Sequence, residues 1–308
     1  MPGAELRGTA ERLLADDGVA YLHVHDAGGR VLRRQDRPRC GGARRGLRRY
    51  GDAVRARLFW VGWLFHLKSL TGSLFFVLVS VLQPMIFASI AFFMVESGNQ
   101  SGTLLYVALG AGLMGIWSAT LFGSGGAIQW QRWQGTLELL VGAPPPFIAS
   151  LLPLTVATAS IGLYSIAATL VWGRLCFGVP LDFAHPAQLA VALPVTVLSL
   201  GMLGLVLAST FVLARNANAF SNLLEYPVWL ATGLLVPLSL LPGWVGPISW
   251  VLAPTWGIDA IRDAAFGDDA WPAIGMCALL GVVYLGIGAV ALRHFERLAR
   301  QKATLALT

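Results

Sequence analysis

The chain has 308 residues, of which 56% are hydrophobic and only 12% are charged. This charged share is about half that of soluble globular domains. The formal charge of +6 does not indicate nucleic-acid binding, because 14 of the 22 Lys and Arg precede residue 69 and the others flank apolar segments. Five stretches without Asp, Glu, Lys or Arg each exceed the roughly 20 residues that a helix needs to cross a bilayer. They are residues 97–131, 139–173, 183–214, 226–257 and 270–292, and they exclude a soluble protein.

Residues 1–42 differ from the rest of the chain. They form a basic segment rich in Gly, Asp and Arg, in which a weak alternation around residues 26–29 is compatible with a small hairpin. The composition equally suits a disordered tail. Both structures stay open for this segment.

A helix is predicted at residues 44–68, because apolar residues recur there at helical spacing with arginines between them. The apolar positions are Leu47, Tyr50, Val54, Leu58, Val61 and Phe65. A helix of this pattern lies in the membrane interface, with its apolar face in the lipid and its arginines at the headgroups. It opens a transmembrane domain that we place at residues 43–300.

Six transmembrane helices are predicted in this domain. Their approximate ranges are 73–95, 103–128, 147–172, 187–214, 223–241 and 271–292. Of the 22 Lys and Arg, 20 fall on the side that holds both ends of the chain, and only Arg174 and Arg262 fall on the other. Positively charged loops stay in the cytoplasm. Both the segment 1–42 and the tail 293–308 are therefore predicted to be cytoplasmic.

The fifth predicted span does not continue as a straight helix. Four prolines and two glycines interrupt the stretch that follows it, which nevertheless stays apolar. They are Pro237, Pro242, Gly243, Gly246, Pro247 and Pro254. Irregular backbone at membrane depth must be shielded by protein or line a cavity, so we predict re-entrant outer helices up to about residue 266. The expected fold class is an all-α membrane protein with six spans, an N-terminal interfacial helix and these re-entrant helices.

Few single residues within the domain carry an obvious role. Small residues of the second span form a ridge that suits close helix packing; they are Ala108, Ala111, Gly112 and Gly115. The residues Asn216, Asn218, Asn222 and Glu225 are interpreted as helix caps around a tight cytoplasmic turn, with a role in gating as the alternative. Arg262, between Asp259 and Asp263, is predicted to lie on an exposed helix face outside the membrane. Ionisable residues are otherwise almost missing from the spans, which disfavours ion-coupled transport.

The sequence contains no motif of a catalytic site. A P-loop requires Gly-x4-Gly-Lys-Ser/Thr, and the nearest string, residues 41–46, is followed by Leu47. Neither a Gly-x-Ser-x-Gly nucleophile turn nor a His-Glu-x-x-His metal helix is present. The chain is therefore predicted not to be an enzyme and to hold no metal or cofactor of its own.

The loop between the second and third spans carries the most specific pattern. Its sequence from residue 129 is QWQRWQGTLELLVGAP. It resembles the E-R-E-x-G-T-L-E-L-L-x-x-x-P pattern of ABC-2 type (type V) transporter permeases, in particular the daunorubicin-exporter-like group. The matching residues are Arg132, Gly135, Thr136, Leu137, Glu138, Leu139, Leu140 and Pro144. Gln131 and Trp133 depart from the pattern, since acids usually stand there. The interfacial helix and the broken fifth span extend the resemblance over about residues 44–300.

The resemblance implies that this loop is a coupling helix, which seats in a groove of a separate ATPase subunit. The implied coupling residues are Gln131, Arg132, Gly135, Thr136, Leu137 and Glu138. Alternatively, Glu138 pairs locally with Arg132 or is solvated. Two ABC ATPase subunits, which bind ATP and Mg, would drive two permease protomers, identical or paralogous, in the bacterial cytoplasmic membrane.

The resemblance also implies a translocation path along the second and fifth spans. We place nearest to it Trp229, Leu230, Gly233, Leu234 and Val236. Their apolar character suits efflux of a lipophilic antibiotic or secondary metabolite, and the short outer loops disfavour import. The alternatives are export of a lipid-linked glycan or lipid, and a membrane assembly subunit that transports nothing.

Overall fold

The computed structural model describes residues 41–97, 104–133, 135, 146–213, 217–234 and 237–302. These residues contain helices and no strand, which confirms the predicted all-α fold. The chain divides into two units, residues 1–49 and 50–308. Of the first unit only the helical backbone of residues 41–49 is described, so the predicted tail at 1–40 lies outside the described residues.

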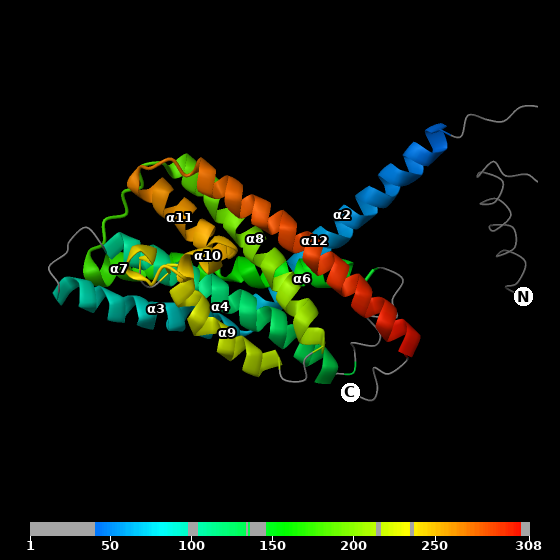
Figure 1. Cartoon of the computed structure of the whole chain (residues 1–308), viewed down its shortest axis with the longest axis horizontal. Helices are drawn as coiled ribbons and strands as arrows, with labels where there is room; N and C mark the ends of the chain where they lie inside the picture. Colours follow the sequence, from blue (N-terminus) through cyan, green and yellow to red (C-terminus); the bar gives the residue numbers. More distant parts are fainter. Residues whose placement is uncertain are drawn as a thin grey trace, which may run out of the picture. The chain divides into compact units, whose positions relative to one another are not determined.

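Most predicted spans correspond to long helices (Figure 1). The predicted interfacial helix is α2 (Gly41–Thr71), and the third predicted span consists of two helices, α6 (Ile148–Ile161) and α7 (Leu163–Phe177). The remaining long helices are α3 (Leu74–Ser97), α4 (Leu104–Trp133), α8 (Pro186–Leu213) and α12 (Trp271–Lys302). Five segments of the described residues are long and apolar enough to cross a membrane, with α6 and α7 counted together.

The fifth predicted span differs from the prediction. In place of a helix at 223–241, α9 occupies Ala217–Ala231, and the chain leaves it at Gly233 with a left-handed φ of 75°. Its 15 residues reach about 22 Å, at 1.5 Å per residue, whereas the hydrocarbon core of a bilayer is about 30 Å thick. The predicted number of six full spans is therefore not confirmed.

Short helices follow α9, as the proline pattern predicts. They are η1 (Leu238–Leu240), α10 (Val245–Trp250) and α11 (Ala253–Phe266). Prolines stand before η1 and at the start of α11, where the missing N–H leaves no helical hydrogen bond unmade. α11 packs against α8, α12 and α4, so this segment returns into the bundle and is not an external loop.

Helix α4 is the centre of the bundle, since it contacts α3, α6, α7, α8, α9 and α11 (Figure 1). Its Trp117 and the Trp229 side chain of α9 are the largest fully buried side chains. A second, smaller apolar cluster joins α6, α8 and α12 around Phe147 and Leu205.

Glycines allow α4 to approach its neighbours closely. A Cβ on Gly112 would lie 2.8 Å from the Ile166 Cα, and one on Gly115 would lie 2.3 Å from the Ser165 Cβ. Distances this short do not occur between real side chains. The predicted role of Gly112 and Gly115 in helix packing is thus confirmed.

Residues 56–71 of helix α2 contact the bundle through one face. The Trp63 indole N–H donates a hydrogen bond to the Ser160 hydroxyl of α6 at 3.1 Å. Leu58, Val61 and Phe65, which belong to the predicted apolar face, are exposed. An exposed apolar face beside a membrane domain agrees with a helix that lies in the interface.

Candidate functional site

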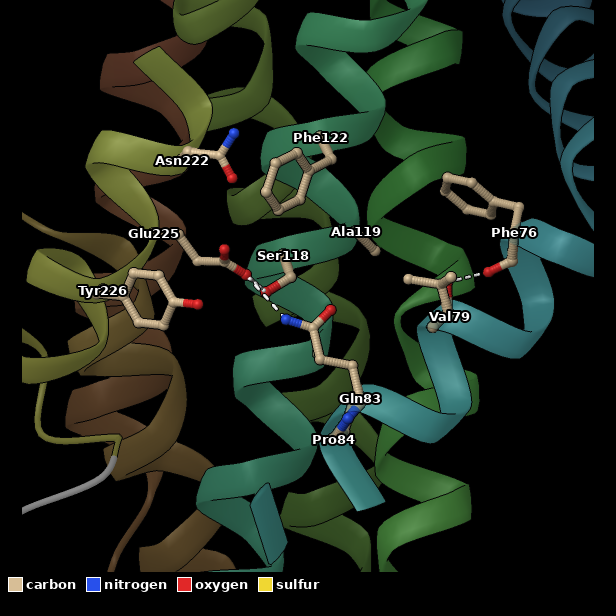
Figure 2. A pocket seen from close by; sticks show the side chains of 12 residues that line it. Phe76, Val79, Gln83, Pro84, Ser118, Ala119, Phe122, Asn222, Glu225 and Tyr226 are labelled. Carbon is tan, nitrogen blue, oxygen red and sulfur yellow. Dashed lines mark hydrogen bonds between the residues drawn. The ribbon is translucent and has the colours of Figure 1, made fainter. Parts of the chain in front are cut away.

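A buried carboxylate joins three helices near the middle of the bundle. Glu225 of α9 is only 3% exposed. Its Oε1 accepts a hydrogen bond from the Ser118 hydroxyl of α4 at 2.7 Å and another from the Gln83 amide of α3 at 3.2 Å. Figure 2 shows the three side chains pointing toward one another from their separate helices. Hydrogen bonds that converge on one carboxylate oxygen fix the orientation of its side chain.

The position of Glu225 contradicts the sequence interpretation. We expected a helix cap beside a cytoplasmic turn, but α9 already begins at Ala217, so Glu225 lies in its third turn. Ser221, Glu225 and Trp229 recur every four residues and are all buried. A carboxylate therefore does lie within the bundle. The spacing to Trp229 was the sequence signal for this, because residues four apart share one helix face.

A cavity of about 440 Å³ surrounds this carboxylate. Side chains of α3, α4 and α9 line it. They are Phe76, Val79, Ser80, Gln83, Pro84, Gly115, Ser118, Ala119, Phe122, Asn222, Glu225 and Tyr226. Val79 of α3 and Tyr226 of α9 are exposed, which places the mouth of the cavity between these two helices. The site is therefore accessible from the side of the bundle.

Proline shapes the α3 wall of the cavity. Pro84 lies inside α3 and has no N–H, so the carbonyl of Ser80, four residues earlier, lacks its helical partner. The Ser165 hydroxyl of α7 donates to that carbonyl at 2.6 Å. The freed backbone group is thus satisfied by a neighbouring helix, as membrane-buried backbone requires. The adjacent Gln83 is the residue of α3 that donates to Glu225.

A second buried charge lies in α11. Arg262 is 6% exposed, and its guanidinium donates to the carbonyls of Gly233 at 2.9 Å, Leu234 at 3.3 Å and Tyr106 at 3.5 Å. It also lies over the Tyr106 ring, 3.3 Å from the centroid. The prediction of an exposed outer face for Arg262 is wrong. The left-handed turn at Gly233 presents the unpaired carbonyls at the end of α9, and a cation there is favourable.

The carboxylate of Asp259, three residues before Arg262 in α11, does not form a close ion pair with the Arg262 guanidinium. α11 is not among the five segments long enough to span a membrane. Burial raises the pKa of the Asp259 carboxyl to about 6, against the opposing attraction of the Arg262 guanidinium. The hydrogen-bond acceptors described for Arg262 are the carbonyls of Gly233 and Leu234, just after α9, and of Tyr106 in α4. Arg262 therefore ties the end of α9 to both α4 and α11.

One family model covers most of the helices described above. The sequence model of ABC-2 type transporters matches residues 59–266, from within α2 to the end of α11. The chain belongs to the ABC-2 type transporter family. No curated protein matches this ABC-2 permease significantly. The family is a membrane domain without an ATPase site, so the chain is a permease subunit of an ABC exporter and a multi-pass membrane protein.

The predicted path residues of the permease divide between its core and its surface. Trp229 is 1% exposed and makes edge-to-face contacts with Phe87 and Tyr226. Leu234 is also buried, whereas Leu230 is half exposed. Arg262 holds the carbonyls of Gly233 and Leu234, as described above. Val236 lies outside the described residues.

The predicted coupling residues lie in the last turn of α4 and directly after it. Gln131 and Arg132 belong to its last turn, and Gly135 is exposed with a φ of 68°. This left-handed conformation is unfavourable for residues with a Cβ, so the turn itself favours glycine. Thr136, Leu137 and Glu138 lie outside the described residues.

Proposed function

We propose that this permease exports a lipophilic small molecule across the bacterial cytoplasmic membrane, with both termini in the cytoplasm. Two separate ABC ATPase subunits supply the energy, and a second permease protomer, identical or paralogous, completes the transporter. The cavity between α3, α4 and α9 carries this proposal. It is lined largely by apolar and aromatic side chains, and such a lining with few polar groups is typical of small-molecule sites.

The surface beside the cavity supports a laterally accessible path. A row of large apolar residues is exposed along α9 at helical spacing: Phe220, Leu223, Tyr226 and Leu230. Such a row needs lipid or a second protomer to cover it. We place the cargo along this row, next to the other predicted path residues Trp229, Gly233, Leu234 and Val236.

Coupling to ATP hydrolysis would enter at the cytoplasmic end of α4. This helix reaches from the residues that we assign to the ATPase contact, Gln131 and Arg132, to Ser118 at the cavity. Movement at the contact would therefore reach the cavity through one continuous helix. Glu138 is the acid of this loop that we assign to a basic residue in the ATPase groove.

Co-purification tests the partnership. The tagged permease should bring an ABC ATPase with it, identified by mass spectrometry, and cargo should stimulate ATP hydrolysis by the complex. Glu138→Ala should weaken ATPase association, because removing one member of a partly buried charge pair leaves the other unpaired, at a cost of about 2–5 kcal/mol. Asp182→Asn, an exposed carboxylate in the loop between α7 and α8, is the matched control and should leave association unchanged.

Two results would contradict the proposal at different levels. Unchanged association, stimulation and export in Glu138→Ala would remove Glu138 from the coupling contact. A wild-type permease that recruits no ATPase would contradict export itself and favour an assembly subunit. Stimulation by lipid-linked glycans, and by no lipophilic small molecule, would assign the other cargo class.

A further inference from the structure

Among the residues that the structure describes, none that lines the cavity of Glu225 carries a positive charge. None of the twelve lining residues is Lys, Arg or His. Its two described hydrogen-bond donors, Ser118 and Gln83, are neutral, and both bind Oε1. Figure 2 shows the second oxygen, Oε2, turned away from both donors. One oxygen is thus held in place while the other remains available to a ligand.

A buried charge of this kind is costly unless a partner compensates it. Neutral donors satisfy hydrogen bonds but leave the net charge in a low-dielectric surrounding. Ionisable residues within membrane bundles are accordingly paired, or they serve the movement of a substrate or ion. Because the described lining residues supply no positive charge, a cation that pairs with Glu225 would have to come from outside the cavity wall.

The aromatic residues that line the cavity indicate which kind of cation would suit it. Three aromatic rings line the same cavity, those of Phe76, Phe122 and Tyr226. Aromatic faces attract organic ammonium groups through the ring quadrupole, most strongly where water is excluded. A metal ion would instead require several oxygen ligands, and the described residues contain no group of three or more His, Cys, Asp or Glu that could hold one.

We propose that this cavity binds the protonated amine of a cationic amphiphile, with the ammonium group at Glu225 Oε2 and the apolar body against the aromatic rings. The volume of about 440 Å³ falls in the range of sites for drug-sized ligands, about 300–1,000 Å³. Because this names the chemistry of the cargo, it rests on the export function proposed above. Binding measured without an ATPase separates the failure of one from the failure of the other.

A matched pair of fluorescent probes tests the charge requirement. Monodansylcadaverine carries a protonated amine at neutral pH, and its N-acetyl derivative is neutral but otherwise the same molecule. Fluorescence anisotropy with the permease in lipid nanodiscs, corrected for empty nanodiscs, should show the amine binding about tenfold more tightly, the ratio that corresponds to one good charge contact. Glu225→Gln preserves the side-chain shape and should abolish this preference.

The control variant is Glu296→Gln, which removes a carboxylate in α12 that does not line the cavity. It should retain the preference for the amine. Equal binding of both probes by the wild type would overturn the assignment, whether or not Glu225→Gln folds. An unchanged preference in folded Glu225→Gln would overturn it as well. If the amine preference depends on Glu225 but no ATPase is recruited, the binding site stands and the export function fails.

Discussion

Arg262 links the end of α9 to α4 and α11, so replacing it should lower the free energy of unfolding of the permease. The shortest of its three hydrogen bonds, to the Gly233 carbonyl at 2.9 Å, falls in the class that contributes about 1.5–3 kcal/mol. The stacking on Tyr106 adds about 1–2 kcal/mol in a desolvated setting. Removing the guanidinium also relieves its own desolvation, which offsets part of the loss. We therefore expect Arg262→Ala to lower the free energy of unfolding by about 3 kcal/mol.

Cys277 provides the assay, because it is fully buried in α12 and should react with a thiol dye only on unfolding. In a background with Cys40 and Cys176 changed to Ser, dye reaction during heating should show a midpoint lowered by about 6–12 °C, from about 2–4 °C per kcal/mol for a chain of this size.

Two further variants separate the contacts of Arg262 from its charge. Arg262→Lys keeps the charge but not the planar group, so its loss should be intermediate. The exposed Arg174→Ala is the control and should change little. A midpoint within about 2 °C of wild type for Arg262→Ala would refute the fastening role.

Three other predictions address packing, coupling and orientation. Gly115→Leu should destabilise the folded permease by about 1–3 kcal/mol through overpacking. Gly126→Leu is its control and should not, because a Cβ at Gly126 meets nothing within 4 Å. The Cys277 assay compares the stability of the two variants. Gly135→Ala should weaken ATPase association about fivefold, since the left-handed turn costs a residue with a Cβ about 1 kcal/mol. Gly135→Asn should bind more tightly than Gly135→Ala, because Asn is tolerated in this conformation. A pull-down titration measures the association, and equal binding of the two variants would exclude a conformational role for Gly135. In intact cells an impermeant thiol reagent should label Cys176 and not Cys40, and labelling of Cys40 would reverse the proposed orientation.

The long helices were predictable because their signal is local. A charge-free run longer than a bilayer crossing specifies a helix whatever its neighbours are, and α4, α8 and the start of α12 lie within two residues of their predicted limits at the N-terminal end. The end of α9 was not predicted, because its last helical residue depends on the left-handed Gly233 and not on apolar content.

The charged residues of the site were misjudged for a different reason. Glu225 and Arg262 stand near ends of apolar runs, where a charge is ordinarily solvated. Their burial depends on groups distant in sequence: Gln83 and Ser118 for Glu225, and Tyr106 for Arg262. Gln83 stands beside Pro84 inside an apolar run. The contact that gives it a role requires three helices to be in place.

The glycine contacts of α4 also determine which parts of the permease move together. Gly112 and Gly115 lie against α7, and Gly123 would clash with Thr158 of α6 if it carried a Cβ. The junction of α6 and α7 also lies close to α4, since a Cβ on Gly162 would lie 2.4 Å from the Ile116 Cα of α4. Backbones packed this closely, here between residues 112 and 123 of α4, are expected to move together. A push at the C-terminal end of α4 should therefore displace α4, α6 and α7 together, and α3 with them, because Pro84 of α3 lies against Gly115.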